Sequence, residues 1–332
     1  MFPTVRTLNA PYASPVSAGA PEIAVVIPTR GRREARLAAA LEALAAQTLE
    51  RDRFEVLVVR DPDVPAPLAP APAGLTHRLI EAPVPTGAAA KRNLGWRATG
   101  APLVAFTDDD CRPSPGWLEA VLASADGADV FVQGRTEPDP VERHDHWGLA
   151  HSQLIEGPSP WYETCNIAYP RSLLERLEGF DEAFPGLGGE DTDLGLRAER
   201  AGARRRYAGE ALVWHAVHPQ RLGDALRQAR QWGDLPLVLA RHDEHRAALR
   251  YRAFLRESHA RLLLAAAGIA SRRPALAALA ALPYLRLHLE AYPPDTHGRL
   301  RAAIDLPARA LVDAVEIAVT ARGALRHRAP ML

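Results

Sequence analysis

The chain has 332 residues, of which 47% are hydrophobic and 24% charged, so it can bury a sizeable core and wholesale disorder is excluded. Forty basic residues balance forty acidic ones, and a net charge of zero argues against a dedicated nucleic-acid-binding protein. The charges are spread unevenly, because residues 220–332 carry 18 basic and 10 acidic side chains and residues 1–219 carry 22 and 30. This asymmetry predicts two modules with different partners.

Features that report on the cellular compartment point to the cytoplasm. The two cysteines, Cys111 and Cys165, are too few for a disulfide framework, and no Cys/His spacing is typical of a zinc site. The first residues lack the basic stretch and apolar run of a signal peptide. No segment has the ~18 uninterrupted apolar residues of a membrane-spanning helix. We expect a cytoplasmic protein, with peripheral contact at the inner membrane face as an alternative.

The front of the chain alternates between predicted strands and helices. Residues 1–20 mix Pro, Ala, Ser and Gly without a period and predict a flexible arm. Continuous apolar runs at 22–28 and 54–59 predict buried strands, and leucines at helical spacing predict a helix between them. The later elements are expected as strand 77–81, helix 88–98, strand 103–107, helix 117–125, strand 130–133, helices from 170 and over 190–201, and strand 211–215. This order predicts an α/β fold with a Rossmann-like, mostly parallel sheet.

Beyond residue 219 the alternation stops. Residues 220–322 are rich in Ala, Leu and Arg and predict helices throughout, with breaks near Pro236, Pro274 and 293–294. The net positive charge of this region and its apolar stretch at 275–285 suit an anionic membrane surface. They also suit a helix–helix core or a homodimer seam, and we favour this second interpretation. The chain is expected to divide into the arm 1–20, an α/β domain 21–218 and an all-helical extension 219–332.

Three consecutive aspartates at 108–110 follow the predicted strand 103–107. Ligands of open α/β sheets bind at the carboxyl ends of strands, where this triplet is expected. On an extended chain Asp108 and Asp110 share one face and Asp109 takes the other. Because converging carboxylates repel each other unless a hard cation neutralises them, the pattern favours a metal site over a solvated acidic turn.

A second acidic cluster, residues 188–193 (GGEDTD), opens a predicted helix. Acids in a first turn are favoured by the helix dipole, so a capping role alone accounts for them. The paired glycines let the backbone approach a ligand closely, and a carboxylate beside them is a candidate proton acceptor. His215, which ends a predicted strand, is either a metal ligand or a core residue.

The order of these motifs resembles the family 2 glycosyltransferases, inverting enzymes that use nucleotide sugars and have the GT-A fold. The resemblance covers residues 22–218. The motifs that carry it are 25–29 (VVIPT), 58–61 (VVRD), 87–95 (GAAAKRNLG), 108–110 (DDD), Asn166 with 179–182 (GFDE), 189–191 (GED) and 214–215 (WH).

The resemblance implies a role for each residue that matches. The residues that would bind the nucleotide sugar are Pro28, Thr29, Arg30, Asp61, Lys91, Arg92, Asp108 and Asp109. A Mn²⁺ or Mg²⁺ ion would be held by Asp108, Asp110 and His215, and an imidazole ligand suits Mn²⁺ somewhat better. Asp191 would be the catalytic base, with Glu190 beside it positioning acceptor or donor. Trp161, Tyr162 and Asn166 lie in the stretch that would receive the acceptor.

The expected function is therefore a metal-dependent, inverting sugar transfer from a UDP-, GDP- or dTDP-linked donor to an unknown hydroxyl acceptor. One alternative is a sugar nucleotidyltransferase, which would need a glycine-rich basic loop after the first strand; residues 29–33 (TRGRR) match such a loop only faintly. Another is a non-catalytic nucleotide-sugar sensor or scaffold, which would bind donor without turnover. The presence of two separate acidic clusters favours the enzyme.

Overall fold

The computed structural model describes residues 20–62, 64, 72–75, 77–142, 148–184 and 188–329, so the arm predicted at 1–20 lies outside them except for its last residue. The strands are β1 (Ile23–Thr29), β2 (Phe54–Arg60), β3 (His77–Glu81), β4 (Leu103–Phe106), β5 (Cys111–Pro113), β6 (Val130–Pro138), β7 (Ile167–Pro170) and β8 (Arg204–His215). The helices of the α/β part are α1 (Glu34–Ala45), α2 (Ala88–Arg97), α3 (Trp117–Ser124), α4 (Arg171–Arg176) and α5 (Glu190–Arg200). The helices that follow are α6 (Leu222–Ala229), α7 (Leu235–Arg241), α8 (Glu257–Ala270), α9 (Pro274–Glu290) and α10 (Thr296–His327). Short 3-10 helices lie at η1 (Arg51–Arg53), η3 (Thr164–Asn166), η4 (Arg230–Asp234) and η5 (Asp243–Ala248).

In the described residues the strands form one sheet of eight, in the order β3-β2-β1-β4-β7-β6-β8-β5. β1 runs parallel to β2 and β4, β2 runs parallel to β3, and β6 runs parallel to β8. β7 is antiparallel to β4 and β6, and β5 is antiparallel to β8. The predicted α/β fold is confirmed, and the sheet is more mixed than expected because β5 and β7 are inserted antiparallel.

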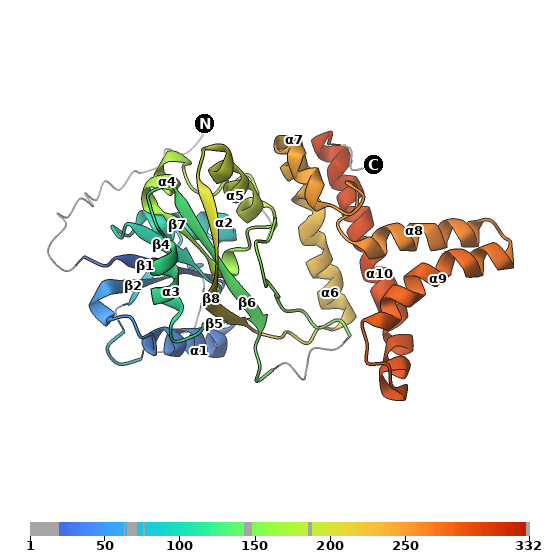
Figure 1. Ribbon diagram of the computed structural model, residues 1–332, viewed down its shortest axis with the longest axis horizontal. Helices are drawn as coiled ribbons and strands as arrows, with labels where there is room; N and C mark the ends of the chain where they lie inside the picture. Colours follow the sequence, from blue (N-terminus) through green and yellow to red (C-terminus); the bar gives the residue numbers. More distant parts are fainter. Residues whose placement is uncertain are drawn as a thin grey trace.

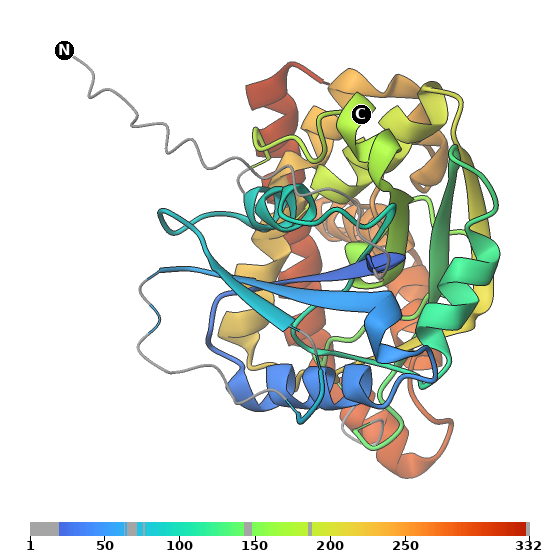
Figure 2. The ribbon, with the colours of Figure 1, turned by 90° about the vertical axis from the view of Figure 1, so that its left-hand side faces the viewer.

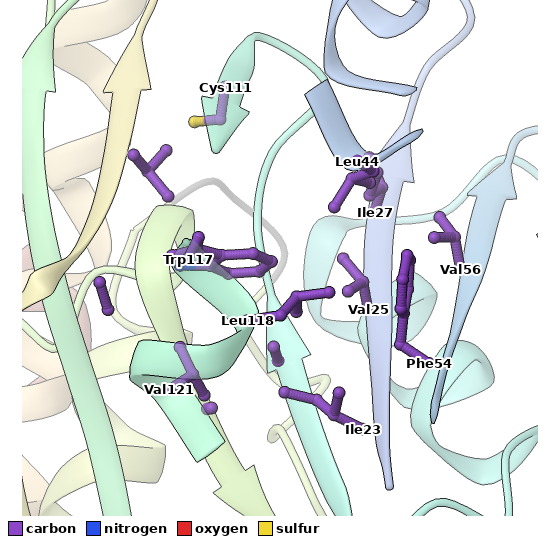
Figure 3. Packing of buried hydrophobic residues seen from close by; sticks show 14 of the residues in the cluster. Ile23, Val25, Ile27, Leu44, Phe54, Val56, Cys111, Trp117, Leu118 and Val121 are labelled. Atoms are coloured by element: carbon purple, nitrogen blue, oxygen red, sulfur yellow. The ribbon is translucent and has the colours of Figure 1, made fainter. Parts of the chain in front are cut away.

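Alternate residues of β1 pack into two separate hydrophobic cores. Ile23, Val25 and Ile27 pack on one face of the sheet with α1 and α3, as Figure 3 shows. Ala24 and Val26 pack on the other face with α2, α4 and α5. Figure 2 shows α1 and α2 on opposite sides of the sheet. Because both faces are covered, the strand is a continuous apolar run and not an alternating pattern.

One buried side chain ties α3 to the centre of the sheet. The fully buried Trp117 donates its Nε1–H to Oδ1 of Asn166 at 2.9 Å. Asn166 in turn donates from Nδ2 to the carbonyl oxygens of Arg135 and Ala211, at 2.7 and 2.8 Å. These carbonyls belong to β6 and β8, next to the register shift after Gly134. Asn166 therefore satisfies backbone groups that the irregular pairing of β6 with β8 leaves without a ladder partner.

Beyond β8 each regular element of the described chain is a helix, as predicted. The proline breaks are confirmed, because Pro236 lies in the first turn of α7, Pro274 begins α9, and α10 starts two residues after the proline pair 293–294. α10 packs against α6, α7 and α8. Figure 1 shows α8 and α9 as a hairpin that projects from α10 on the side away from the sheet. Within the described residues, no helix has both the length and the apolar character needed to cross a bilayer.

We expect Asn166→Ala to lower the free energy of unfolding by about 2–3 kcal/mol, because it leaves one buried N–H and two buried carbonyl oxygens without partners. Trp117→Phe removes the indole N–H together with part of a fully buried ring, and should cost about 2–3 kcal/mol. Urea unfolding of the two single variants and of the double variant measures their coupling. Additive losses in the double variant would contradict the proposed role of this hydrogen bond.

Candidate functional site

A cavity of about 840 Å³ lies at the edge of the sheet where the parallel strands β1 and β4 end. The predicted site residues that line it are Pro28, Thr29, Arg30, Lys91, Arg92, Asp108, Asp109, Asp110, Glu190, Asp191 and His215. The structure thus brings together two acidic clusters that are about eighty residues apart in the sequence. Asp61, Trp161, Tyr162 and Asn166 are not among its lining residues.

The guanidinium of Arg92 connects the two acidic clusters. It donates to Oδ1 of Asp108 at 3.1 Å and to Oε1 of Glu190 at 3.0 Å, and the residue is only 5% exposed. Burial raises the pKa of Glu190 above its ordinary value, and the Arg92 charge opposes that rise. Arg92 is therefore the cation that allows the buried carboxylate of Glu190 and the half-buried carboxylate of Asp108, from distant segments, to share one wall.

A second guanidinium, from Arg33, contacts the rest of the aspartate triplet. It lies 3.2 Å from Oδ1 of Asp109 and also contacts Oδ2 of Asp110. The expected placement of Asp109 on the opposite face is therefore wrong, since all three aspartates line the same cavity. Residues 107–110 leave the extended conformation of β4 and turn, with the amide of Cys111 donating to the Asp108 carbonyl at 3.2 Å.

Asp109 and Asp110 differ in their acidity because their neighbours differ. Burial, opposed by a 2.6 Å hydrogen bond from the Thr29 hydroxyl, raises the pKa of Asp109 to about 6. Burial would also raise the pKa of Asp110, but His218, His215 and Arg33 together hold it below its ordinary value. Asp110 thus stays ionised more readily than Asp109, as a metal ligand must.

Two histidines stand beside Asp110. The Nε2 atom of His218 lies 2.7 Å from Oδ2 of Asp110, whereas Nε2 of His215 lies 3.9 Å from Oδ1. Asp110, Cys111 and His215 also offer ligand atoms that all lie within 4.8 Å of one another. Cys111 is a free, fully buried thiol whose pKa is raised by burial, so it is the weakest candidate ligand of the group.

Among the described residues, Asp191 has no ion-pair partner. It follows Gly189, whose φ of +102° suits glycine, in the first turn of α5. In the described part of the chain its hydrogen bond comes from the amide of Thr192, at 2.8 Å. Burial and then the neighbouring charge of Glu190 hold the pKa of Asp191 well above its ordinary value. A carboxylate with a raised pKa on a cavity wall is suited to accept a proton.

Asp61 lies behind the cavity wall and contacts it through Lys91. The Lys91 ammonium lies 2.8 Å from Oδ1 of Asp61, and the amide of Thr86 donates to the same oxygen at 3.1 Å. Lys91 is the chain's single lysine and is buried. Burial would raise the pKa of Asp61, but Lys91 and the Thr86 amide lower it below its ordinary value.

A second cavity of about 700 Å³ adjoins the first, and Asp191 lines both. Trp161 lines this second cavity, but Tyr162 and Asn166 line neither one. Tyr162 is buried against Gly195, where an added Cβ would lie 2.2 Å from the tyrosine ring, and Asn166 is the core residue described above. The far wall of the second cavity comes from the helical part and includes Arg256, Tyr284, His288, Arg309, Asp313 and Glu316.

Several residues of the site were not singled out in the sequence. Arg33 belongs to the basic turn after β1, and His218 is the second histidine of the segment WHAVH, so both carried a local signal. Arg227 and Arg230 line the first cavity from α6 and η4. Nothing in the local sequence of these two arginines links them to the acidic residues of the site, which lie in earlier segments of the chain.

We expect Arg92→Met to lower the free energy of unfolding by about 3–5 kcal/mol, because it leaves the buried carboxylate of Glu190 and the half-buried carboxylate of Asp108 without their cation. Arg97→Met, on the same helix but with a half-exposed side chain, should cost less than about 1 kcal/mol. Urea unfolding measures both. Mild acid should recover part of the free energy of unfolding that Arg92→Met loses. Because the pKa of Glu190 is raised in the folded state, the folded state binds a proton there more tightly than the unfolded state does. Equal losses for the two variants would contradict the bridging role of Arg92.

Two sequence models of one glycosyltransferase group match the chain. "Glycosyl transferase family 2" matches residues 24–182, and "Glycosyl transferase family group 2" matches residues 129–289. Validoxylamine A glucosyltransferase of Streptomyces hygroscopicus subsp. limoneus is 29% identical over 261 residues, which is 65% of this chain and 56% of the relative. Pre-mycofactocin glycosyltransferase of Mycobacterium tuberculosis (strain CDC 1551 / Oshkosh) is 32% identical over 187 residues, 52% of this chain and 39% of the relative. The chain thus spans between two fifths and just over half of the length of these relatives.

The fold is also shared with a protein of known structure. The mannosyltransferase PcManGT from Pyrobaculum calidifontis, in complex with GDP-Man and Mn²⁺, is similar with a TM-score of 0.58 at 19% identity, over 92% of this chain and 88% of that one. At this level of identity the similarity concerns the fold. The two sequence matches assign residues 24–289 to the glycosyl transferase family 2 group, and the structural similarity shows that the fold is GT-A.

Proposed function

We propose that the chain is a metal-dependent, inverting glycosyltransferase that moves a sugar from a nucleoside-diphosphate sugar to an acceptor hydroxyl. The observation that carries the proposal is the meeting of the aspartate triplet with Glu190 and Asp191 in one cavity, connected through Arg92. An inverting transfer needs one group of residues to offset the charge of the leaving diphosphate and a separate base to take the hydroxyl proton. The two acidic clusters are proposed to divide these tasks.

The donor is proposed to bind in the first cavity. Its wall carries positive charge from Arg30, Arg32, Lys91, Arg227 and Arg230, which suits the two phosphates of a nucleoside diphosphate. Pro28 and Thr29 line the same cavity, and Asp61 is proposed to act on the base side through Lys91. The similar fold of PcManGT was solved with GDP-Man bound, which supports a nucleotide-sugar donor here and leaves UDP, GDP and dTDP to be separated by experiment.

The residues beside the triplet fit a divalent metal. Asp109 and Asp110 already hold a cation, the Arg33 guanidinium, and two imidazoles stand next to Asp110. We propose that Asp110 and His215 hold the ion, with Asp108 at its edge and His218 as a further ligand. This mixed nitrogen and oxygen donor set favours Mn²⁺ over Mg²⁺. When bound, the metal would neutralise the charge that grows on the leaving nucleoside diphosphate.

Asp191 is proposed to be the base. The acceptor hydroxyl would attack the anomeric carbon from the face opposite the leaving group, and one Asp191 oxygen would take its proton. Glu190 is fixed by Arg92 and is proposed to orient donor or acceptor rather than to carry the proton. Asp191 suits the proton transfer because its raised pKa makes it a stronger base than an ordinary aspartate once it is ionised.

The acceptor is proposed to occupy the second cavity, since Asp191 belongs to both cavity walls. On this proposal the α/β part, residues 21–218, supplies most of the donor site, and the extension 219–332 supplies the far wall of the acceptor site. Trp161 offers a flat apolar face for a sugar ring, and Arg256, Asp313 and Glu316 offer charged hydrogen-bonding groups. Such a lining suits a polyhydroxylated acceptor.

We expect Asp191→Asn to lower the rate of donor cleavage by about 10²–10⁴-fold while donor binding persists, because only the proton acceptor is removed. The wild-type rate should rise with pH through the raised pKa of Asp191, and the variant should lose this limb. Since the ionised form of Asp191 is disfavoured in the folded state, the variant should also unfold at the same or a higher temperature in alkaline buffer. Glu199→Gln, an exposed change on the same helix, is the control. A variant with full activity would contradict the assignment.

The donor and the metal are tested together by thermal shift with UDP-, GDP- and dTDP-sugars, each with and without Mn²⁺, and by release of the nucleoside diphosphate. One nucleotide should give a metal-dependent shift and slow hydrolysis. Asp110→Ala should abolish the metal dependence of both readouts, because it removes the carboxylate that the two histidines flank. The absence of any shift with all three nucleotides would overturn the proposed function.

A further inference from the structure

The α8–α9 hairpin (residues 257–290) is packed through its small residues. Gly268 of α8 faces α9 so closely that an added Cβ would lie 2.4 Å from Cβ of Ala280 and 3.1 Å from the carbonyl oxygen of Leu276. Ala265, one turn earlier, is also buried. The two helices therefore approach each other along alanine and glycine, with no layer of leucines between them.

The large apolar side chains of the hairpin point outward. Six of them are between 44% and 68% exposed: Leu264, Ile269, Leu276, Leu279, Leu282 and Leu289. A hairpin that is surrounded by water is expected to have the opposite arrangement, with leucines inside and polar groups outside. Small residues between helices and leucines around them are typical of helices with apolar surroundings.

Between its two terminal residues, Glu257 and Glu290, the hairpin carries charge of one sign. No Asp or Glu occurs from residue 258 to residue 289, whereas Arg261, Arg272, Arg273 and Arg286 do. Arg261 and Arg286 pair with the acids at the base of the hairpin, Glu257 and Glu290. Arg272 and Arg273 are exposed in the turn between the helices. The exposed leucines are thus accompanied by positive charge, which is the combination that attracts an anionic lipid surface.

We propose that the α8–α9 hairpin lies in the surface of a bilayer that contains anionic lipids. Its leucines reach the boundary of the acyl chains, and Arg272 and Arg273 contact the lipid phosphates. The hairpin lies flat and does not cross the bilayer, because α8 and α9 have only 14 and 17 residues. Burying two turn arginines in hydrocarbon is also expensive.

A second copy of the chain is a poorer occupant of this surface. Its own hairpin carries the same positive charge and no acid between residues 258 and 289, so two hairpins repel each other. The acidic α/β part would attract the hairpin, but the large apolar side chains that it exposes in the described residues are isolated ones: Leu79, Val84, Val141 and Leu154. An anionic bilayer supplies both the apolar layer and the negative charge.

Binding of the hairpin to a bilayer does not depend on the proposed function, but it has a consequence for the acceptor site. Tyr284 and His288, near the base of α9, line the second cavity. A hairpin that lies on a bilayer therefore holds that cavity close to the lipid surface.

Flotation of the full chain with lipid vesicles tests the proposal. Wild type should float with vesicles of phosphatidylcholine and phosphatidylglycerol, bind much less to phosphatidylcholine alone, and lose binding at high salt. The double change Leu279→Gln, Leu282→Gln should weaken binding at least about tenfold, because the leucines supply the apolar contact. The double change Arg272→Gln, Arg273→Gln should weaken it by about fivefold per arginine, on the anionic vesicles only.

Leu325→Gln changes a still more exposed leucine at the end of α10 and should bind vesicles as wild type does. Thermal unfolding tests whether each variant is folded. Because the changed side chains are exposed, we expect every variant to fold as wild type does. Binding that is equal for all variants, or no binding to either vesicle, overturns the proposal. A dimer in solution that is lost in the Leu279→Gln, Leu282→Gln variant, without vesicle binding, also overturns it and assigns the surface to a second copy.

Discussion

The rest of the site depends on one buried cation, Arg92, and on the packing that fixes its position. Arg92 lies on α2, and its partner Glu190 begins α5; both helices pack into the same hydrophobic core on one face of the sheet. Asp108 follows β4, the strand that runs beside β1. The packing of the core therefore fixes the distance between the two acidic clusters. The charge of the guanidinium offsets the repulsion between their carboxylates. A lysine, with one charged atom in place of a planar fork, could not contact both carboxylates in this way.

The cations of the site are distributed so that its carboxylates differ in acidity. Asp110 has His218 and Arg33 as close neighbours and stays ionised, whereas Asp109 beside it has a pKa raised to about 6. Asp191 has no ion-pair partner in the part of the chain that the structure describes, although Glu190 next to it is paired with Arg92. Carboxylates that are adjacent in the sequence are thus made suitable for different tasks by what surrounds them.

The sequence predicted those features that local pattern determines. The apolar run of β1, the leucine spacing of α1 and the proline breaks between the later helices all appear where they were expected. β5 and β7 were missed because strands of three and four residues are too short to show a period. The alternation expected for 108–110 failed because a turn follows β4, and that turn depends on contacts made by distant segments.

The proposed acceptor residues show another limit. A motif gives the position of Tyr162 and Asn166 along the chain, but the direction of each side chain is decided by neighbours from elsewhere. Tyr162 fills the space above Gly195, and Asn166 bonds to Trp117 and to two carbonyl groups of the sheet. The residues that take their place around the second cavity come from helices for which the sequence offered no motif.

Because α6 and η4 line the first cavity, the helical part of the chain cannot be exchanged for that of a relative without changing this cavity. Arg227 and Arg230 face the same space as the aspartate triplet, although they lie beyond the last strand. A chimaera that exchanged the helices between relatives to alter acceptor choice would also replace one wall of the proposed donor pocket. Selection on the acceptor and selection on the donor therefore act on some of the same residues, so the two specificities are expected to evolve together.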